Sequence, residues 1–222
     1  MRLEAVEVRA WSDLYDAAPA GLAGGLGLVR EVVGDAAVFR ARLPSPLFNR
    51  TLGMARLDGD VLDARGYQPR TRWVKLTRPA GALAPVATPL RIAEADASLA
   101  DVFGRTLCAA YGMPEGLAPW NAALVGRPGW RCYLAFDGDA PVGTAALFLD
   151  GEIGWLGAAA TLPTQRRRGG QRALIARRIA DATAAGASLL VSETGLAPDN
   201  PSLRNLLAAG FVVAYERENY VR

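Results

Sequence analysis

The chain has 222 residues, a hydrophobic fraction of 51%, a charged fraction of 21% and a net charge of +3, which is typical of a globular protein rather than a disordered one. It contains no histidine, which excludes Ser-His-Asp catalysis and histidine-ligated metals, and the sequence predicts no metal site. No uncharged apolar stretch approaches the ~18 residues of a membrane span. The first residues lack the pattern of a secretory signal, so we expect a cytoplasmic protein without membrane contact.

The basic residues are almost all arginine: 24 of the 25 are arginine and only Lys75 is lysine. A GC-rich coding sequence explains this bias better than a nucleic-acid-binding surface does, because the net charge is modest. The two cysteines, Cys108 and Cys132, do not form a disulfide framework.

The first 78 residues carry weaker patterns than the rest. They predict a helix over residues 14–22, a turn at Gly34-Asp35, and strands over residues 28–33, 36–42 and 73–76.

One short spacing occurs in both halves of the chain. The pattern is a leucine, three residues, a glycine and an aromatic residue. It occurs from Leu62 to Tyr67 and again, 144 residues later, from Leu206 to Phe211. A strand-like segment follows each copy. This repeat favours a duplicated domain over coincidence. The passage from Leu57 to Val61 is too short for the helix and strand of a complete copy.

Residues 79–90 predict a semi-rigid linker, because they contain three prolines and have neither a helical nor a strand period. We therefore expect one unit over residues 1–78 and a second over residues 91–222.

The second unit has clearer signals. Turns are expected at Asp137-Gly138-Asp139 and at Asp150-Gly151. The expected order is a helix over 98–111 capped by Ser98, a short helix or loop at 119–121, an antiparallel meander of strands over 130–136, 142–149 and 152–161, a helix from about 166 to 185, a strand over 187–194, a helix over 201–209 and a strand over 211–221.

A basic, glycine-rich turn joins the third strand of the meander to the next helix. The first N–H groups of a helix have no intrahelical partner and carry partial positive charge. Gly169 and Gly170 are expected to let the backbone approach an anion, and arginines at 166, 167, 168 and 172 add charge. This combination predicts a pyrophosphate site.

The same stretch resembles a known family. Residues 161–174, with Pro163, Arg166 and Gly169, are similar to motif A of the GCN5-related N-acetyltransferase (GNAT) superfamily, although Gln171 stands where the family has glycine or alanine. Residues 200–211, which run from an asparagine to Gly-Phe, are similar to its motif B. The resemblance covers residues 91–222, and the first 78 residues resemble a degenerate lobe of a tandem member.

The resemblance implies an α/β (α+β mixed sheet) GNAT fold, with a mostly antiparallel central sheet flanked by helices and a smaller degenerate GNAT-like N-terminal lobe. It implies transfer of an acetyl group from acetyl-CoA to a primary amine of a small molecule or peptide by direct attack. The expected cofactor-binding residues are Ala159, Ala160, Thr161, Arg166, Arg167, Arg168, Gly169, Gly170, Gln171, Arg172, Asn200, Ser202 and Asn205.

The catalytic groups are the least defined part of the sequence. Glu193, at the end of a predicted strand, is a candidate general base, with an ion pair to a neighbouring arginine as the open alternative. Leu206 occupies the place of the usual tyrosine acid, so Ser202, Tyr111 or water would have to supply that proton. Tyr215 is a candidate for the acceptor pocket, with ordinary sheet packing as its alternative.

Two other functions remain open at the level of the sequence. One is a coenzyme A-binding protein without transferase activity, which the missing tyrosine suggests. The other is a nucleic-acid-binding module that uses the arginine run, although the phosphates of a cofactor explain that run with fewer assumptions.

Overall fold

The computed structural model describes residues 2–33, 36–43, 45, 48–53, 59–64 and 66–221. The turn expected at Gly34-Asp35 and the first two residues of the short passage from Leu57 to Val61 lie outside these residues.

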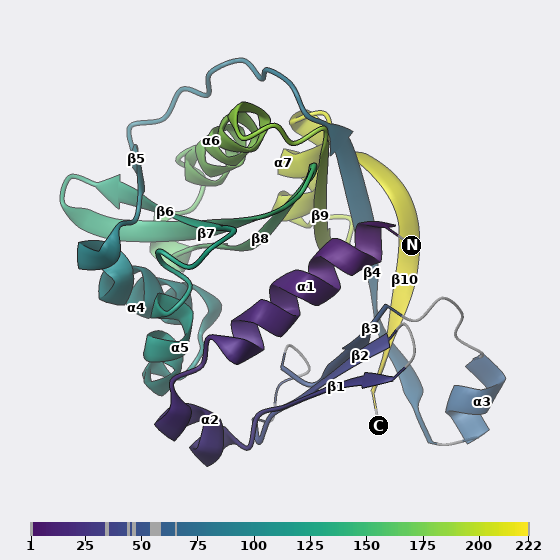
Figure 1. Ribbon diagram of the computed structural model, residues 1–222. Coiled ribbons are helices and arrows are strands. Elements are labelled where there is room, and N and C mark those ends of the chain that lie inside the picture. The colour runs from purple at the N-terminus through teal and green to yellow at the C-terminus, as the bar shows by residue number, and fades with distance from the viewer. Residues whose placement is uncertain are drawn as a thin grey trace.

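The described residues between 2 and 79 form three helices and four strands (Figure 1). These are α1 (Arg2–Asp16), α2 (Ala20–Leu26), β1 (Val29–Val33), β2 (Ala36–Arg40), β3 (Arg50–Leu52), α3 (Gly59–Ala64) and β4 (Gln68–Pro79). The single helix expected over residues 14–22 is wrong, because α1 begins at Arg2 and Pro19 separates it from α2.

The second half follows the predicted order closely. It contains β5 (Arg91–Glu94), α4 (Ala100–Tyr111), α5 (Ala118–Ala122), β6 (Trp130–Asp137), β7 (Ala140–Asp150), β8 (Ile153–Thr161), α6 (Gly170–Ala184), β9 (Leu189–Gly195), α7 (Pro201–Ala208) and β10 (Val212–Val221). The cap of the 98–111 helix differs from the prediction. A short 3₁₀ turn precedes α4, and the Asp96 carboxylate accepts a hydrogen bond from the Ser98 N–H at 2.9 Å.

The strands form two sheets, and the larger one uses both halves of the chain. Its order is β10-β4-β9-β8-β7-β6-β5, and the smaller sheet is β1-β2-β3. In the larger sheet only β8 and β9 run parallel. The fold is therefore an α+β mixed sheet with a small N-terminal three-stranded sheet. The larger sheet crosses the boundary expected at residues 79–90, because β4 lies before that boundary and pairs with two strands that follow it.

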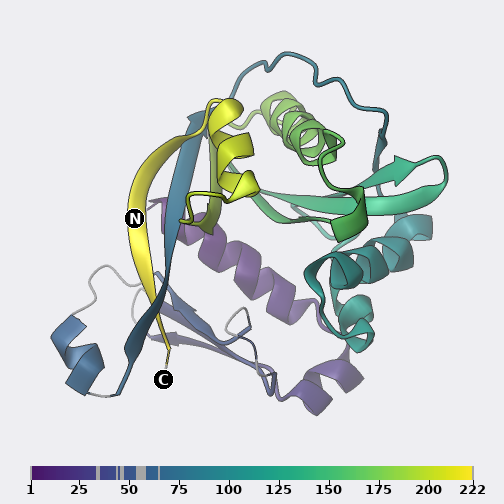
Figure 2. The same ribbon diagram turned by 180° about the vertical axis from the view of Figure 1, so that it is seen from behind.

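Helices cover both faces of the larger sheet. Helix α1 lies in front of β4 and β9 in Figure 1, and α7 lies in front of them in the reverse view of Figure 2. One core cluster joins the sheet to α6 and α7, through Ile175, Ile179 and Leu206. A second joins the opposite face to α1 and α4, through Val6 and Phe103.

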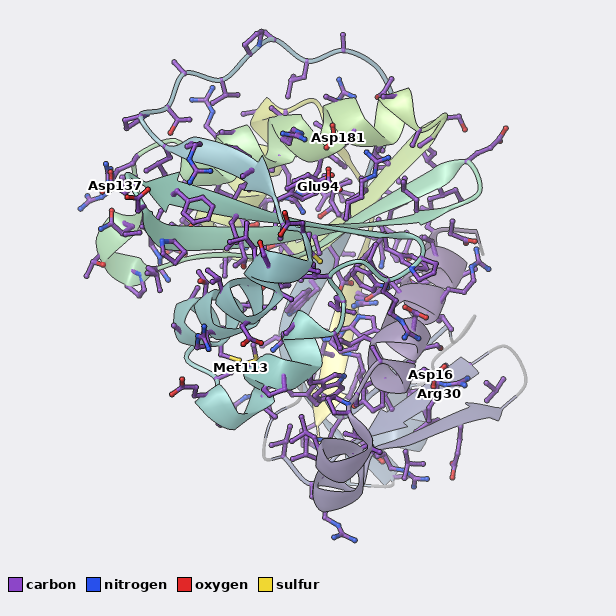
Figure 3. All side chains as sticks on the ribbon, turned by 60° about the vertical axis from the view of Figure 1, so that its left-hand side comes forward. Asp16, Arg30, Glu94, Met113, Asp137 and Asp181 are labelled. Carbon is purple, nitrogen blue, oxygen red and sulfur yellow. The ribbon has the colours of Figure 1, made fainter. Side chains whose placement is uncertain are left out.

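A third core cluster connects the N-terminal elements to the second half. Trp11 and Tyr15 of α1 and Phe39 of β2 pack with Phe48 and Trp120, and all five rings are buried. An ion pair between Asp16 and Arg30, both labelled in Figure 3, also ties the end of α1 to β1. Apolar burial therefore holds the two halves together as one packed unit.

Candidate functional site

The parallel strands β8 and β9 separate part-way along their length. Their pairing ends at Leu156 opposite Ser192, whereas β8 continues to Thr161 and β9 to Gly195. A bulge in β8 accompanies the separation, because the β7–β8 register shifts after Gly157 and Ala158 has a φ of 45°. The shift leaves an opening between the two strands, next to the basic turn.

A buried arginine of α6 stabilises this bulge through hydrogen bonds to backbone carbonyl groups. Arg178 of α6 is 2% exposed. Its guanidinium donates hydrogen bonds to the carbonyl oxygens of Leu174 at 3.0 Å, Ala146 at 3.1 Å and Gly157 at 3.3 Å. Burial lowers the pKa of Arg178 to about 10, so the side chain remains charged at neutral pH. The charge satisfies carbonyl groups on both sides of the β7–β8 bulge.

The backbone N–H groups of the basic turn have no backbone acceptor among the residues that the structure describes. Residues 166–169 turn through Arg167, with a φ of 64°, and Gly169, with a φ of 82°, into the start of α6. Among the described residues, no hydrogen bond is donated by the backbone N–H groups of residues 166–172. These donors are free to bind a ligand.

Gly169 and Gly170 also allow close packing against a neighbouring segment, which the sequence did not indicate. A Cβ atom on Gly169 would lie 3.1 Å from the carbonyl oxygen of Ala87, and one on Gly170 would lie 2.8 Å from Cδ1 of Leu90. The Thr88 hydroxyl donates a hydrogen bond to the Arg168 carbonyl at 2.8 Å. The missing side chains therefore make room for the 79–90 segment, which passes over α6 in Figure 1 and lies against the turn.

Arg168 differs from the arginines beside it. Its guanidinium donates to both carboxylate oxygens of Asp137, labelled in Figure 3, at 2.6 and 2.8 Å. This pair joins the turn to the β6–β7 hairpin, and the Arg168 side chain does not line the cleft described next. The carboxylate neutralises the charge that the sequence assigned to anion binding.

A cleft of about 790 Å³ lies at the opening between β8 and β9. It is lined from three sides, by the end of β8, by the turn with the start of α6, and by α7. Its lining is Ala110, Tyr111, Ala159, Ala160, Thr161, Pro163, Gln165, Arg166, Arg167, Gly169, Gly170, Gln171, Arg172, Asn200, Pro201, Ser202, Arg204 and Asn205. Apart from Arg168, the residues expected to hold the cofactor lie together here.

Hydrogen bonds fix α7 as one wall of the cleft. The Gln171 amide donates to the Ser202 hydroxyl at 3.1 Å and accepts from the Asn205 amide at 2.6 Å. The Asn200 side chain caps α7, by accepting from the Ser202 N–H, and donates to the Gly195 carbonyl at 2.6 Å. The Gln171 side chain is thus turned towards α7.

Glu193 lies in a buried ion cluster on the α1 side of the sheet. Its carboxylate is 8% exposed and does not line the cleft. It lies 2.5 Å from Arg217, 3.3 Å from Lys75 and 3.5 Å from Arg50. Burial alone would raise the pKa of Glu193, but Lys75 and the two arginines lower it to about 2. A carboxylate with so low a pKa is a weak base.

Glu7 of α1 is the member of this cluster that sequence reasoning missed. It is completely buried and hydrogen-bonds to Lys75. Burial, together with the nearby Glu193 charge, raises the pKa of Glu7 to about 8. Lys75 is itself fully buried, and the occurrence of a single lysine among 25 basic residues was the one signal in the sequence that marked this place.

The remaining catalytic candidates lie in different places. The Tyr215 hydroxyl hydrogen-bonds to Glu4 of α1, away from the cleft. Leu206 is 2% exposed in the core. Tyr111 lines the cleft, and its hydroxyl donates to the Ala159 carbonyl at 3.1 Å, beside the β8 bulge. Tyr111 is 47% exposed, and a phenol is protonated at neutral pH.

The family follows from the sequence of the half that carries this cleft. Residues 99–211, about half of the chain, match the acetyltransferase (GNAT) family. The chain belongs to this family of N-acetyltransferases. The match includes every residue that lines the cleft, from Ala110 on α4 to Asn205 on α7.

Solved GNAT structures share the fold. A GCN5-related N-acetyltransferase from Kribbella flavida superposes with a TM-score of 0.59 at 16% identity, over 96% of this chain and 94% of that one. One from Sphaerobacter thermophilus gives a TM-score of 0.59 at 16% identity, over 72% of this chain and 54% of that one. This GNAT chain therefore spans about half the length of the Sphaerobacter protein.

A third solved structure from the same family also shares the fold. A GNAT-family acetyltransferase from Novosphingobium aromaticivorans gives a TM-score of 0.53 at 13% identity, over 87% of this chain and 88% of that one. No curated protein matches the sequence.

In the part of the chain that the structure describes, no helix is long and apolar enough to cross a bilayer.

Proposed function

We propose that this GNAT protein binds acetyl-CoA in the β8–β9 cleft and transfers its acetyl group to a primary amine of a small molecule or peptide by direct attack. The observation that carries the proposal is the coincidence of free helix N–H groups, unpaired arginines and separated parallel strands in one cleft. These features suit an anionic head and an extended arm, which are the two parts of coenzyme A.

The chain's own residues fit the cofactor. The N–H groups of residues 169–172, with Arg166 and Arg167, would hold the pyrophosphate, because no carboxylate lines the cleft to oppose the anion. Ala159, Ala160 and Thr161 would line the pantetheine arm along the free edge of β8. Asn200, Ser202 and Asn205 would face it from the α7 side.

Acetyl-CoA would supply a thioester, and the protein would supply polarisation, alignment and a proton. A backbone N–H at the bulge near Ala159 would polarise the thioester carbonyl. The Tyr111 hydroxyl, close to the same bulge, is our candidate for the group that would protonate the departing thiolate. The Ser202 hydroxyl is engaged with Gln171, which makes it the weaker candidate.

We assign Glu193 a structural role rather than that of the general base. Three cations surround its carboxylate and its pKa is low. Water in the cleft would then take the proton of the amine. Tyr215, which is held by Glu4, would likewise support α1 rather than line the acceptor pocket.

We also propose that residues 1–78 are a reduced copy of the second half that binds no cofactor. The repeated spacing supports this interpretation, because each copy leads into one of two paired strands, β4 and β10. Between its described strands and helices this region has no basic glycine-rich turn. Its role would be to complete the sheet and to cover the α1 side.

A thiol-release assay over a panel of primary amines tests the transferase. We expect amine-dependent release of coenzyme A, reduced at least tenfold in kcat by Tyr111→Phe, with acetyl-CoA affinity preserved. Tyr67→Phe is a control outside the cleft. Binding of acetyl-CoA without release above hydrolysis for any amine would favour a coenzyme A-binding protein without transferase activity.

A further inference from the structure

The 79–90 segment follows α6 from its last turn to its first. At one end the Gly81 N–H donates a hydrogen bond to the Thr183 hydroxyl at 3.0 Å. At the other end the Thr88 hydroxyl donates to the Arg168 carbonyl at 2.8 Å. Figure 1 shows the segment crossing over α6 between these two contacts. The segment lies outside residues 99–211, which match the family, so its contact with the basic turn is not covered by that match.

The Thr88 hydroxyl has its proton committed to Arg168. Its oxygen accepts a hydrogen bond from the Leu90 N–H at 3.2 Å, and a hydroxyl has one proton to donate, which goes to the Arg168 carbonyl. The Arg168 side chain is held separately, since Asp137 accepts from its guanidinium at 2.6 and 2.8 Å. Both the carbonyl and the side chain of Arg168 are therefore fixed by segments outside the turn.

The contact with Thr88 sets the direction of the neighbouring N–H group. The Arg168 carbonyl and the Gly169 N–H belong to one planar trans peptide, in which they point in opposite directions. Thr88 holds the carbonyl on the side of the 79–90 segment and does not line the cleft, whereas Gly169 does. The Gly169 N–H consequently points away from that segment and towards the cleft.

The same peptide has the conformational freedom to turn over. Gly169 has a φ of 82°, and glycine adopts φ values of either sign at similar cost. Rotation of the peptide would exchange its carbonyl and its N–H, and would present a partially negative oxygen to the cleft. Among the described residues, no acceptor binds the Gly169 N–H, so the hydrogen bond from Thr88 is the described contact that opposes this rotation.

We propose that Thr88 is a positioning residue for the anion site: its hydroxyl holds the Arg168–Gly169 peptide with the N–H towards the cleft, where the pyrophosphate of coenzyme A would bind. This inference rests on the proposed function, because it uses the same cleft and the same cofactor. An N–H that donates to an anion forms a stronger hydrogen bond than one that donates to a neutral group. A carbonyl in its place would repel the anion, so the direction of this one peptide affects the affinity.

Removal of the Thr88 hydroxyl tests the proposal. Thr88→Val nearly keeps the shape of the side chain, and in titration calorimetry of the full-length protein it should weaken coenzyme A binding about tenfold. Thr88→Ser retains the hydroxyl and should bind coenzyme A as the wild type does. Pantetheine, which lacks the pyrophosphate, should bind the wild type and Thr88→Val with equal affinity.

A matched control and a second readout make the test specific. Thr183→Val removes the hydroxyl that holds the other end of the 79–90 segment, and it should leave coenzyme A affinity unchanged. Nuclear magnetic resonance of the Gly169 amide reports the direction of the peptide itself. Saturating coenzyme A should move the amide proton downfield in the wild type and in Thr88→Ser, and should move it less in Thr88→Val.

Equal affinities of the wild type and Thr88→Val for coenzyme A would overturn the role of Thr88 and leave the proposed function intact. Equal losses in Thr88→Val and Thr183→Val would also overturn it, because the whole segment rather than one peptide would then support the site. A matching loss of pantetheine affinity in Thr88→Val would overturn it as general damage to the cleft. A wild type that binds neither ligand would refute the proposed cofactor site itself.

Discussion

Some residues that do not line the cleft stabilise the strands that form it. Arg178 is the clearest case, because a buried guanidinium without a carboxylate partner is costly unless its hydrogen bonds are satisfied. Its three carbonyl partners include Ala146 and Gly157, on the two strands that the bulge separates. Its neighbour Arg177 is partly exposed and pairs with Asp181 at 2.8 Å instead.

Replacing Arg178 should therefore destabilise the fold strongly. Arg178→Met keeps the approximate length of the side chain but removes its hydrogen bonds to three carbonyl oxygens, which should cost about 2–4 kcal/mol of unfolding free energy. Arg177→Met, on the exposed side of the same helix, should cost less than about 1 kcal/mol. Urea denaturation measures both values, and equal losses would contradict the role given to Arg178.

Substitution of Glu193 distinguishes a structural role in an ion pair from a catalytic role as general base. Glu193→Gln leaves Lys75 and Arg217 with an uncharged partner in a buried site, which should lower the unfolding free energy by about 3–5 kcal/mol. Acetyl-CoA affinity and kcat of the folded fraction should change less than tenfold. A stable variant with kcat reduced by two or more orders of magnitude would instead identify Glu193 as the base.

Glu7 should give the stability of the protein a distinctive pH dependence. Its pKa rises from 4.5 to about 8 on folding, so the folded chain holds a proton that the unfolded chain has released. The contribution of this group to stability is therefore complete below about pH 4.5 and is lost as the pH rises towards 8.

Glu7→Gln removes that titration while keeping the shape of the protonated side chain. Between pH 5 and pH 8.5, the melting temperature of the variant should rise relative to that of the wild type. Thermal unfolding followed by circular dichroism across this range measures the difference. Parallel curves would mean that Glu7 is ionised in the folded protein throughout.

Among the elements, β4 is the strand that joins the first half of the chain to the sheet of the second half. It pairs with β9 on one side and β10 on the other. Beyond Leu156 and Ser192, β9 has no pairing with β8, so β4 is the described neighbour that holds the end of β9 and all of β10.

A chain that begins at Pro89 should consequently not fold on its own. It retains the turn and α6 but loses the strand that joins β9 to β10, and it exposes the apolar face covered by α1. We expect aggregation and no measurable acetyl-CoA binding. Co-expression with residues 1–88 should restore a soluble, binding-competent complex. A soluble fragment with the affinity of the full chain would contradict the shared sheet.

The elements that the sequence predicted are those with local signals. The β6–β7–β8 meander follows from alternating strands and two glycine turns, and the basic turn before α6 follows from its own residues. Helix α1 was missed because Glu4 and Glu7 interrupt its apolar stripe, and their partner Lys75 lies about 70 residues later. The place of β4 depends on long-range pairing, and the contacts of Arg178 and Tyr111 depend on packing, so neither could be derived from local sequence.

At the scale of the whole molecule, the fold places one cationic cleft where the central strands β8 and β9 separate, in a sheet that both halves complete. The first half adds the α1 cover, the buried ion cluster and β4, while the second half supplies every residue that lines the cleft. One chain should therefore bind one coenzyme A, and the N-terminal three-stranded sheet should bind none.

A crystal structure of the full-length protein with acetyl-CoA tests this account most directly. We predict one cofactor per chain, with its pyrophosphate at the N–H groups of residues 169–172, its pantetheine arm between Ala159–Thr161 and α7, and its thioester beside the Ala159 bulge and the Tyr111 hydroxyl. A cofactor bound elsewhere, or a second one against residues 1–78, would contradict the assignment of the cleft.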